Sequence, residues 1–155
     1  MACFETTRRV PFTPSEMFAV VADIESYPLF LPLCESLTIT SRTETGADTV
    51  LVATMAVGYR SIRELLTTRV TLSPAQLTIL VDYIEGPFRH LENRWRFVPV
   101  PGGADVGFSI EYEFRSVMLR LLMGAVFDKA VRHYAEAFEA RARLLYGAPS
   151  RVPGA

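Results

Sequence analysis

The segment Ser116–Tyr146, SVMLRLLMGAVFDKAVRHYAEAFEARARLLY, decides the fold of this 155-residue chain. Its apolar residues recur at intervals of three and four, the spacing that gathers side chains on one face of an α-helix. A single helix of this length extends for about 45 Å, so a broad apolar surface has to lie beneath it. The predicted apolar stripe consists of Leu119, Leu122, Val126, Ala130, Tyr134, Phe138 and Leu145.

Two stop signals follow this helix. Gly147 favours the left-handed backbone that ends helices, and Pro149 cannot continue one. A chain of this length is large enough to bury a core without disulfides or metals. We therefore expect one domain over residues 1–148, followed by a flexible tail over residues 149–155.

Composition argues against several classes of function. The net charge of −1 lacks the basic surplus with which nucleic-acid binders replace phosphate counterions. Cys3 and Cys34 form no metal-ligand or redox spacing, so we expect neither a metal nor a redox cofactor. No apolar run approaches the about 20 residues that span a bilayer, and the first ten residues lack the apolar core of a secretory signal. We expect a soluble, cytoplasmic protein, and leave peripheral contact at the inner face of the membrane open.

The chain begins with an extended segment over residues 4–10, followed by two short helices. Thr13 and Glu16 form a capping box, which predicts that a helix starts at Pro14. A second short helical piece is predicted over residues 24–30.

Between residues 34 and 114 the apolar pattern changes to period two, broken at short intervals by turn residues. This pattern predicts an antiparallel meander, and hence a sheet of six to seven strands with the N-terminal one. The predicted strands are Cys34–Arg42, Thr49–Val57, Ser61–Leu72, Gln76–Ile84, Leu91–Val100 and Ala104–Phe114.

The last two of these strands predict a hairpin with one apolar and one charged face. Aromatic residues alternate with arginines in the first strand and with glutamates in the second. Of two neighbouring registers, we expect the one that pairs Arg94 with Glu113 and Arg96 with Glu111, because it avoids facing like charges.

A half-apolar antiparallel sheet and a long amphipathic helix together predict an α+β fold in which the helix packs across a curved sheet. A curled sheet around a straight helix leaves room for a cavity. A filled core explains the same periodicity, and both interpretations stay open. The residues expected to face inward are Leu51, Ala53, Met55, Val57, Ile62, Leu66, Val70, Leu77, Ile79, Val81, Tyr83, Trp95, Phe97, Phe108, Ile110 and Tyr112.

Glu64 is the charged exception on this inward face, where an unpaired carboxylate is costly. It either orients a ligand oxygen or pairs with Arg60 or Arg63. Catalytic motifs are absent from the sequence, and His90 and His133 stand beside no nucleophile or carboxylate at a recognisable spacing. We expect a protein that is not an enzyme.

Three motifs follow one another along the chain: VADIESYPLFLPLC at residues 21–34, GPF at residues 86–88 with WRF at residues 95–97, and AFEARA at residues 137–142. Together they resemble the coenzyme Q-binding START-like family, over Thr6–Gly147. The resemblance implies the helix-grip fold, in which a long C-terminal helix closes a hydrophobic tunnel over an antiparallel sheet. Leu33 departs from the family pattern, which often has an aromatic residue at that position.

The resemblance also implies a non-catalytic carrier or chaperone of ubiquinone, or of a related isoprenoid quinone, that supports respiratory electron transport. Expected partners are the lipid and, transiently, a membrane or respiratory complex. Bacterial relatives described as ribosome-association toxins leave a regulator that blocks subunit association as an alternative. A polyketide cyclase-type enzyme, with Glu64 as its acid or base, is a further alternative.

The expected ligand-binding residues fall into three groups. Glu64, Trp95 and Tyr112 are expected at the quinone head, and the first half of the last helix along the tail. Residues of the YPLFLP segment and the GPF turn are expected at the mouth, where a hydrophobic plug or a plain loop explains them equally well. The full set is Tyr27, Phe30, Leu31, Met55, Glu64, Phe88, Trp95, Phe97, Tyr112, Leu119, Leu122, Met123 and Val126.

The last helix also carries a polar stripe, expected to face water. Ion pairs at i,i+4 spacing are predicted between Asp128 and Arg132, Arg132 and Glu136, and Glu139 and Arg143. The apolar arc widens toward the N-terminal end of the helix, around Leu121. We expect this end to be the tunnel mouth and to dock on a membrane or partner, and self-association fits the pattern equally well.

Overall fold

The computed structural model describes residues 1–147, so Pro149 and the tail predicted over residues 149–155 lie outside the described residues. One strand, two short helices, six strands and two further helices follow one another. They are β1 (Ala2–Val10), α1 (Pro14–Ala22), the 3-10 helix η1 (Ile24–Leu29), β2 (Cys34–Thr45), β3 (Asp48–Tyr59), β4 (Ile62–Ser73), β5 (Thr78–Glu85), β6 (Phe88–Val100), β7 (Gly103–Phe114), α2 (Val117–Val131) and α3 (Tyr134–Tyr146).

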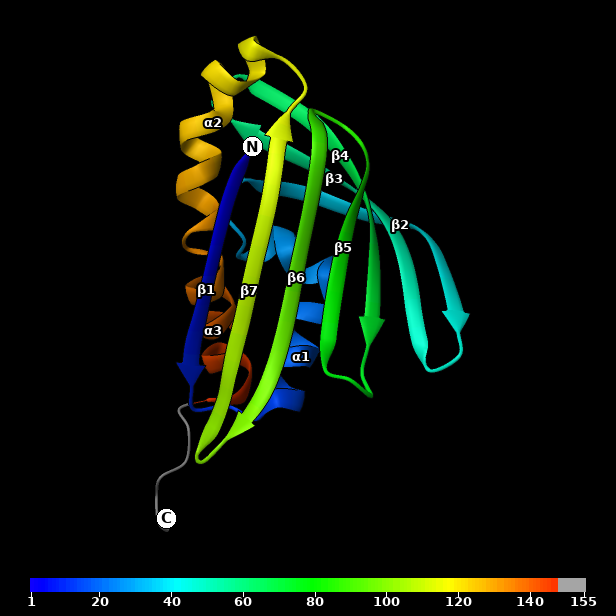
Figure 1. Ribbon diagram of the computed structural model, residues 1–155, viewed down its shortest axis with the longest axis vertical. Helices are drawn as coiled ribbons and strands as arrows, with labels where there is room; N and C mark the ends of the chain where they lie inside the picture. Colours follow the sequence, from blue (N-terminus) through cyan, green and yellow to red (C-terminus); the bar gives the residue numbers. More distant parts are fainter. Residues whose placement is uncertain (148–155) are drawn as a thin grey trace.

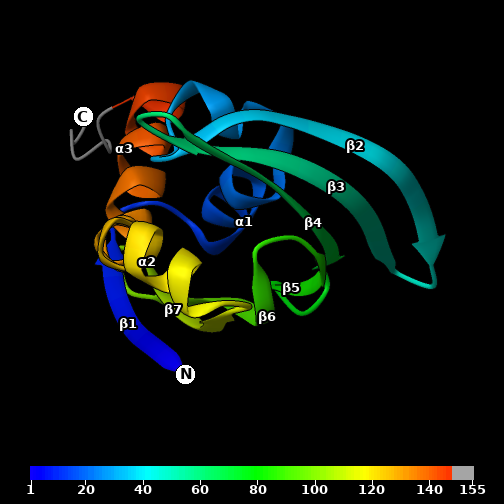
Figure 2. The same cartoon turned by 90° about the horizontal axis from the view of Figure 1, so that it is seen from above.

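The strands form one antiparallel sheet in the order β1-β7-β6-β5-β4-β3-β2. Each strand from β2 to β7 pairs with its neighbour in the chain, and β1 pairs with β7. The sheet curls strongly, so that β2–β4 turn across α1 and η1 and away from the plane of β6 and β7 (Figures 1 and 2). The predicted α+β fold, with a curved sheet and two short helices after the first strand, is confirmed.

The start of α1 is the predicted one. The amide of Glu16 donates to Thr13 Oγ1 at 3.0 Å, and Glu16 Oε1 accepts from the amide of Thr13 at 2.9 Å. Phe12 and Met17, on either side of this cap, are both buried. The cap therefore fixes the point at which the chain leaves β1 and enters the curl of the sheet.

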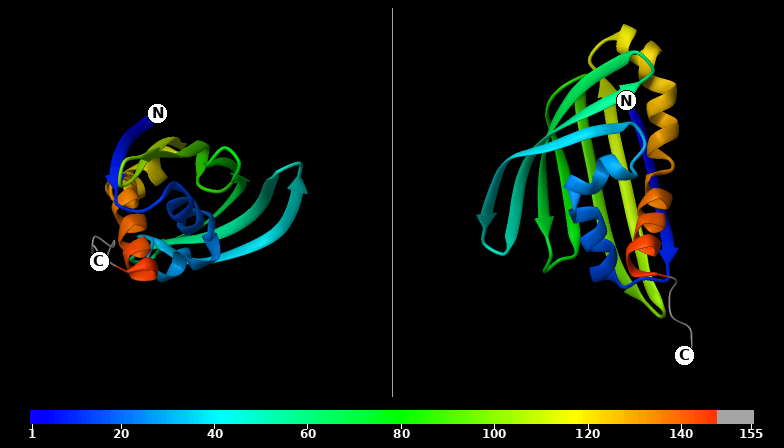
Figure 3. Two further views of the ribbon diagram at one scale, coloured as in Figure 1. Left: turned by 90° about the horizontal axis from the view of Figure 1, so that it is seen from below. Right: turned by 180° about the vertical axis from the view of Figure 1, so that it is seen from behind.

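The C-terminal segment is two helices and not the single long helix predicted. α2 ends at Val131 and α3 begins at Tyr134. Between them, the amide of His133 donates to the carbonyl of Ala130, and His133 Nδ1 lies 2.8 Å from the carbonyl oxygen of Lys129. The imidazole ring thus competes for the carbonyl that the helical hydrogen bond would use. The two helices run one after the other along one side of the curled sheet (Figure 3).

The predicted apolar stripe is wrong at Leu122 and at Leu145, which are 53% and 51% exposed. Met123 and Phe127 are buried in place of Leu122 and Val126, because the break at His133 changes the helical phase between α3 and α2. Leu145 lies in the last turn of α3.

The predicted polar stripe forms in part. Arg132 pairs with Asp128 at 3.2 Å and Arg143 with Glu139 at 2.8 Å. Glu139 is nevertheless buried and does not face water, because Arg8 of β1 reaches its Oε1 at 2.5 Å. The third predicted pair, which spans the helix break, is absent from residues 1–147.

The predicted register of the β6–β7 hairpin is wrong. Arg94 faces Ser109 and Arg96 faces Gly107, each four residues earlier in β7 than the predicted glutamate. The two-residue turn between the strands fixes this register. This register places Glu92 of β6 directly opposite Glu111 of β7. Arg94 Nε donates to one of them, Glu92, at 2.7 Å and offsets their repulsion.

Candidate functional site

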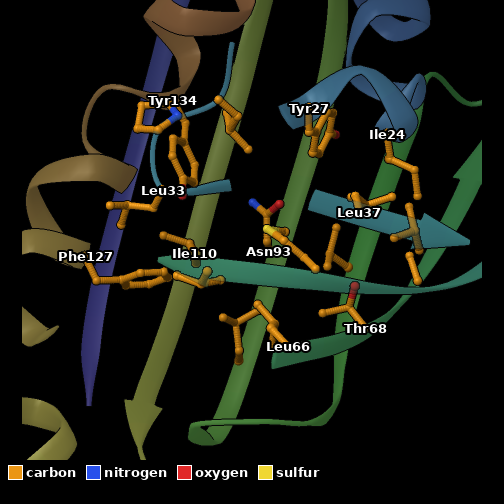
Figure 4. A pocket seen from close by; sticks show the side chains of 18 of the residues that line it. Ile24, Tyr27, Leu33, Leu37, Leu66, Thr68, Asn93, Ile110, Phe127 and Tyr134 are labelled. Carbon is orange, nitrogen blue, oxygen red and sulfur yellow. The ribbon is translucent and has the colours of Figure 1, made fainter. Parts of the chain in front are cut away.

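A small cavity of about 90 Å³ lies between the curled sheet, η1 and the two C-terminal helices. The lining is mostly aliphatic and aromatic, and it contains no Asp, Glu, His, Lys or Arg within residues 1–147. Figure 4 shows Asn93 in the middle of this space, with Tyr27 and Tyr134 on one side and Leu66 and Thr68 on the other. The lining residues are Ile24, Tyr27, Leu31, Pro32, Leu33, Leu37, Ala53, Met55, Val57, Leu66, Thr68, Val70, Val81, Leu91, Asn93, Trp95, Ile110, Phe127, Tyr134 and Phe138.

The hollow in the sheet arises from a pair of small residues. Ala53 of β3 stands directly opposite Thr68 of β4, and both are buried. On either side of this pair, the inward positions carry larger side chains, as in the facing pair Met55 and Leu66. Because interiors are otherwise close-packed, two small residues facing each other leave a depression.

One polar network is built into the wall of the cavity. Asn93 Nδ2 donates to the carbonyl of Ser109 at 2.8 Å, and Asn93 Oδ1 accepts from Trp95 Nε1 at 2.9 Å. These bonds satisfy the indole N–H and hold the ring of Trp95 against the cavity.

Two hydroxyls of the lining are left available. Thr68, on the sheet, and Tyr134, at the start of α3, make no side-chain hydrogen bond within residues 1–147. By contrast, Tyr27 Oη donates to the carbonyl of Val21 at 2.5 Å. Thr68 and Tyr134 can therefore donate to a polar group inside the cavity, which a satisfied hydroxyl would do less readily.

The roof of the cavity comes from η1 and the loop after it. The ring of Phe138 lies 5.2 Å from the ring centroids of both Tyr27 and Phe30, which ties η1 to α3. Leu33 lines the cavity with a φ of +72°, a backbone state that costs about 1–2 kcal/mol outside glycine. Its carbonyl accepts from the amide of Gly58 at 3.0 Å, which anchors the loop to the end of β3.

An aromatic plug, defined as Phe88, Tyr112, Phe114 and Phe127, closes the end of the cavity toward the start of α2. The ring centroid of Phe88 lies 4.7 Å from that of Phe114 and 5.2 Å from that of Phe127, and the centroid of Tyr112 lies 4.8 Å from that of Phe127. Phe127 belongs to the cavity lining and the other three do not. The plug thus separates the cavity from the end of the molecule at which α2 begins.

The structure brings some of the predicted ligand-binding residues together at this cavity. Tyr27, Leu31, Met55 and Trp95 all contribute to its lining. Phe30 packs behind Tyr27, and Phe97 is stacked on Trp95 with ring centroids 6.2 Å apart. Phe88 and Tyr112 lie in the aromatic plug.

The remaining predicted residues lie away from the cavity. Glu64 is half-buried near the turn between β3 and β4, outside the lining, and Arg63, one of its predicted partners, pairs with Glu35 at 2.7 Å. None of the four predicted residues on α2 lines the cavity. Met123 is buried in the core, Leu122 is exposed, and Leu119 and Val126 are half-buried.

Sequence reasoning missed the polar residues of the site, Thr68 and Asn93, and the aromatic side chains of Phe127, Tyr134 and Phe138. The last two belonged to the predicted apolar stripe but were not assigned to a site. Thr68 is in phase with Leu66 and Val70 on β4, so a polar residue at an inward position was the signal that could have found it.

Burial raises the pKa of several groups around the cavity. It raises the pKa of the Cys34 thiol from 9.0 to about 11 and that of Tyr112 from 10.0 to about 12. Burial also raises the pKa of Tyr27 and of Tyr134. These groups therefore stay protonated in the folded protein at neutral pH.

The raised pKa values predict alkaline destabilisation. The unfolded chain loses these protons from about pH 9, while the folded chain keeps them. The free energy of unfolding therefore has its highest value below pH 9 and falls as pH rises toward about 12. Cys34→Ala should move the onset to about pH 10, where tyrosine begins to ionise, and Cys3→Ala at an exposed thiol should not. Urea unfolding at a series of pH values measures this, and a free energy that stays flat from pH 9 to 12 contradicts it.

The described part of the chain holds no cluster of metal ligands: within residues 1–147 no three His, Cys, Asp or Glu side chains gather closely enough to hold a metal ion. None of the helices in that part of the chain is both long and apolar enough to cross a membrane.

A protein-family model described as polyketide cyclase / dehydrase and lipid transport matches residues 10–139. The chain belongs to this family. The match spans α1, η1, β2 to β7 and α2, and it includes every residue that lines the cavity. The site therefore lies within the part of the chain that the polyketide cyclase / dehydrase and lipid transport family shares.

Relatives within the family carry two kinds of name. The ribosome association toxin RatA of Escherichia coli (strain K12) is 32% identical over 143 residues, which cover 92% of this chain and 87% of that protein. The mitochondrial coenzyme Q-binding protein COQ10 homolog B of Xenopus laevis is 27% identical over 148 residues, which cover 93% of this chain and 59% of that protein. The resemblance drawn from the three sequence motifs is confirmed.

A solved structure has the same fold. The solution structure of the 18 kDa protein CC1736 from Caulobacter crescentus is 34% identical, covers 96% of this chain and 100% of that one, and superposes with a TM-score of 0.77. The helix-grip, START-like arrangement predicted from the sequence is therefore the fold of this chain, with the closing helix divided in two.

Proposed function

We propose that this protein binds a neutral isoprenoid quinone, ubiquinone or a close relative, and delivers it to membrane enzymes without changing it chemically. The observation that carries the proposal is the cavity lining, which is apolar, uncharged and equipped with two available hydroxyls. The ring of the quinone would occupy the hollow, and part of its tail would follow the apolar wall.

The polarity of the lining favours a neutral ligand with hydrogen-bond acceptors. A phosphate or carboxylate head group would lose its hydration without meeting a cation, which costs several kcal/mol. A quinone carbonyl needs only a donor, and the hydroxyls of Thr68 and Tyr134 lie at the lining from two different elements. Burial of the tail supplies affinity at ~25 cal/mol per Å² before the costs of binding are counted.

The size of the cavity implies that the ligand opens the protein. Small-molecule sites usually measure about 300–1,000 Å³. The cavity of this protein, at about 90 Å³, is smaller. Phe127 is the one plug residue that lines the cavity, and it belongs to α2. We infer that α2 shifts to withdraw Phe127 when ligand enters, so that the space behind the plug joins the cavity.

The lining also favours a carrier over an enzyme of the cyclase type. An acid or base that works near neutral pH is expected in a catalytic site, and tyrosines are the titratable residues of this lining within residues 1–147. Their raised pKa keeps them protonated, which suits them as donors and not as bases. Glu64, the residue suggested for such a role by the sequence, lies outside the lining.

The comparisons give support of a coarser kind. The family description includes lipid transport, and the Xenopus laevis relative is named as a coenzyme Q-binding protein. These names agree with a lipid ligand, and the choice of a quinone rests on the uncharged lining and its two donors.

A second candidate function follows from the RatA relatives. Identity of 32% across 92% of the chain supports a regulator that associates with ribosomes. Because the chain has no surplus of basic residues, this association would use contacts with ribosomal proteins. Sedimentation of purified protein with ribosomal subunits at physiological salt tests this candidate, and migration with the subunits would favour it.

Extraction of purified protein with organic solvent, followed by mass spectrometry, tests the proposed ligand. We expect an isoprenoid quinone in the extract, at a stoichiometry that rises when quinone is added before purification. Absence of any isoprenoid lipid, together with failure of added quinone to bind, contradicts the proposal.

The substitution Thr68→Val tests whether the hydroxyl of Thr68 contributes to ligand binding or to the stability of the fold. Because the hydroxyl of Thr68 makes no side-chain hydrogen bond within residues 1–147, its loss should leave the stability unchanged or slightly raised. Quinone affinity should fall about three- to tenfold, the equivalent of one hydrogen bond. Thr67→Val is the matched control: it loses the hydrogen bond to Thr54 at 2.8 Å on the other face of β4 and should lower stability without lowering affinity. Equal affinity in Thr68→Val and the wild type removes Thr68 from the site.

A further inference from the structure

The end of the molecule at which α2 begins exposes large apolar side chains. Within α2 they occupy its first two turns, and beside it they lie on the outer surface of β4 and β5. We call this set the docking face. Its members, with their exposed fractions, are Leu65 (65%), Ile84 (39%), Val117 (62%), Met118 (69%), Leu121 (76%) and Leu122 (53%).

Two hollows connect the strand members of the docking face to the start of α2. One hollow is lined by Leu65, Ile84 and Arg115, and the other by Arg115, Val117 and Arg120. Met118, Leu121 and Leu122 follow Val117 in the first two turns of α2. The two hollows meet at Arg115. Figure 1 shows the start of α2, the β3–β4 turn and the β5–β6 turn at the same end of the molecule, away from α3.

Arginines surround the docking face. Arg115 donates to the carbonyl of Gly86 at 2.6 Å, and Arg60, in the β3–β4 turn, lies over the ring of Tyr59 at 5.3 Å. Neither of these arginines, nor Arg120, has a carboxylate within ion-pair distance in residues 1–147. Most of the other arginines in residues 1–147 are paired with carboxylates, with Arg69, Arg96 and Arg141 as the exceptions, and three arginines at this face are available to a partner.

Acidic residues near the docking face cancel part of this charge. Glu113 is paired with Arg89 at 3.6 Å, and Asp128 with Arg132 at 3.2 Å. Glu85 is the remaining acidic residue in the two hollows, and Glu64, next to Leu65 near the β3–β4 turn, has no ion-pair partner within residues 1–147. The face therefore combines exposed Leu, Met, Val and Ile side chains with a net positive rim.

We propose that the docking face binds the surface of an anionic phospholipid bilayer. Flexible apolar side chains insert between acyl chains, and the arginines contact lipid phosphates, the combination that holds interfacial helices at a membrane. The start of α2 then lies in the interface, while the rest of that helix carries the plug residue Phe127 at the cavity wall. Docking places the plugged end of the cavity next to the bilayer.

Flotation with lipid vesicles tests this proposal. Full-length protein should bind vesicles of phosphatidylglycerol mixed with phosphatidylcholine and bind phosphatidylcholine alone weakly. Leu121→Glu should reduce binding roughly tenfold or more, since one exposed leucine is lost from the interface. The double substitution Arg60→Gln with Arg120→Gln should reduce binding roughly fivefold per arginine and remove the preference for the anionic vesicles.

Matched controls make the outcome decisive. Leu144→Glu changes a leucine of similar exposure, 72%, on α3 and should bind vesicles like the wild type. Circular dichroism and thermal unfolding should be unchanged in each variant. Vesicle binding that is equal in wild type and Leu121→Glu overturns the proposal, as does wild-type protein that binds neither kind of vesicle. A dimer that Leu121→Glu dissociates in analytical ultracentrifugation, with vesicle binding unaffected, assigns the face to self-association and also overturns it.

The docking face and the proposed ligand are tested separately. A variant with its cavity filled, Ala53→Phe, should still float with anionic vesicles, because Ala53 is buried in the sheet and is no member of the docking face. Loss of quinone binding alone therefore leaves this inference standing, and loss of vesicle binding alone leaves the carrier function standing.

Discussion

Ala53→Phe should abolish lipid binding while leaving the protein folded. Ala53 is 4% exposed and forms the hollow together with Thr68, which faces it on the neighbouring strand. A phenyl ring at this position occupies the space that the quinone ring would take. We expect affinity for quinone to fall on the order of 100-fold, at a cost in stability of about 1–3 kcal/mol if the ring overfills the hollow.

The measurement is the amount of isoprenoid lipid that copurifies with the variant and its ability to take up added quinone. Ala56→Phe serves as the control, since Ala56 lies on the same strand in the opposite phase and outside the cavity lining. The control should bind quinone like the wild type. A filled variant that still carries lipid would place the binding site elsewhere.

Phe138→Ala should destabilise the protein severely. Phe138 is 1% exposed, and its ring centroid lies 5.2 Å from Tyr27, 5.2 Å from Phe30 and 5.0 Å from Trp95. Truncation leaves a void between the sheet, η1 and α3. Substitutions of this type cost about 3–5 kcal/mol, a large fraction of the stability of a typical domain.

Urea unfolding followed by circular dichroism measures this loss. Leu145→Ala is the matched control, because Leu145 belonged to the same predicted stripe but is 51% exposed, and its loss should cost well under 1 kcal/mol. Similar losses in the two variants would contradict the packing described for α3.

Much of the fold could be predicted from local sequence signals. The capping box of Thr13 and Glu16, the period-two strands and the order of the elements all follow from short-range chemistry. The β6–β7 register could not be predicted from charge alone, because the length of the turn decided it against the preferred charge pairing. The break at His133 could not be predicted either, because the imidazole ring competes for the carbonyl of Lys129 only in the folded helix.

The candidate site was harder to predict than the fold. The inward residues followed from alternation along each strand, but the hollow depends on Ala53 facing Thr68, and that pairing appears only once the register of β3 and β4 is known. Phe127 was missed because the predicted stripe passed through Val126, one position away. Glu64 was chosen for its charge at an inward position, and the structure places it toward the end of the sheet, outside the lining.

The fluorescence of Trp95 tests most directly whether the cavity holds a quinone. Trp95 is the one tryptophan of the 155-residue sequence, and it lines the cavity. A quinone ring in the cavity lies against the indole and quenches its emission. We predict saturable quenching on titration with a short-chain ubiquinone in the wild type, and none in Ala53→Phe. Quenching that does not saturate, or that is the same in both proteins, would contradict a quinone site in this cavity.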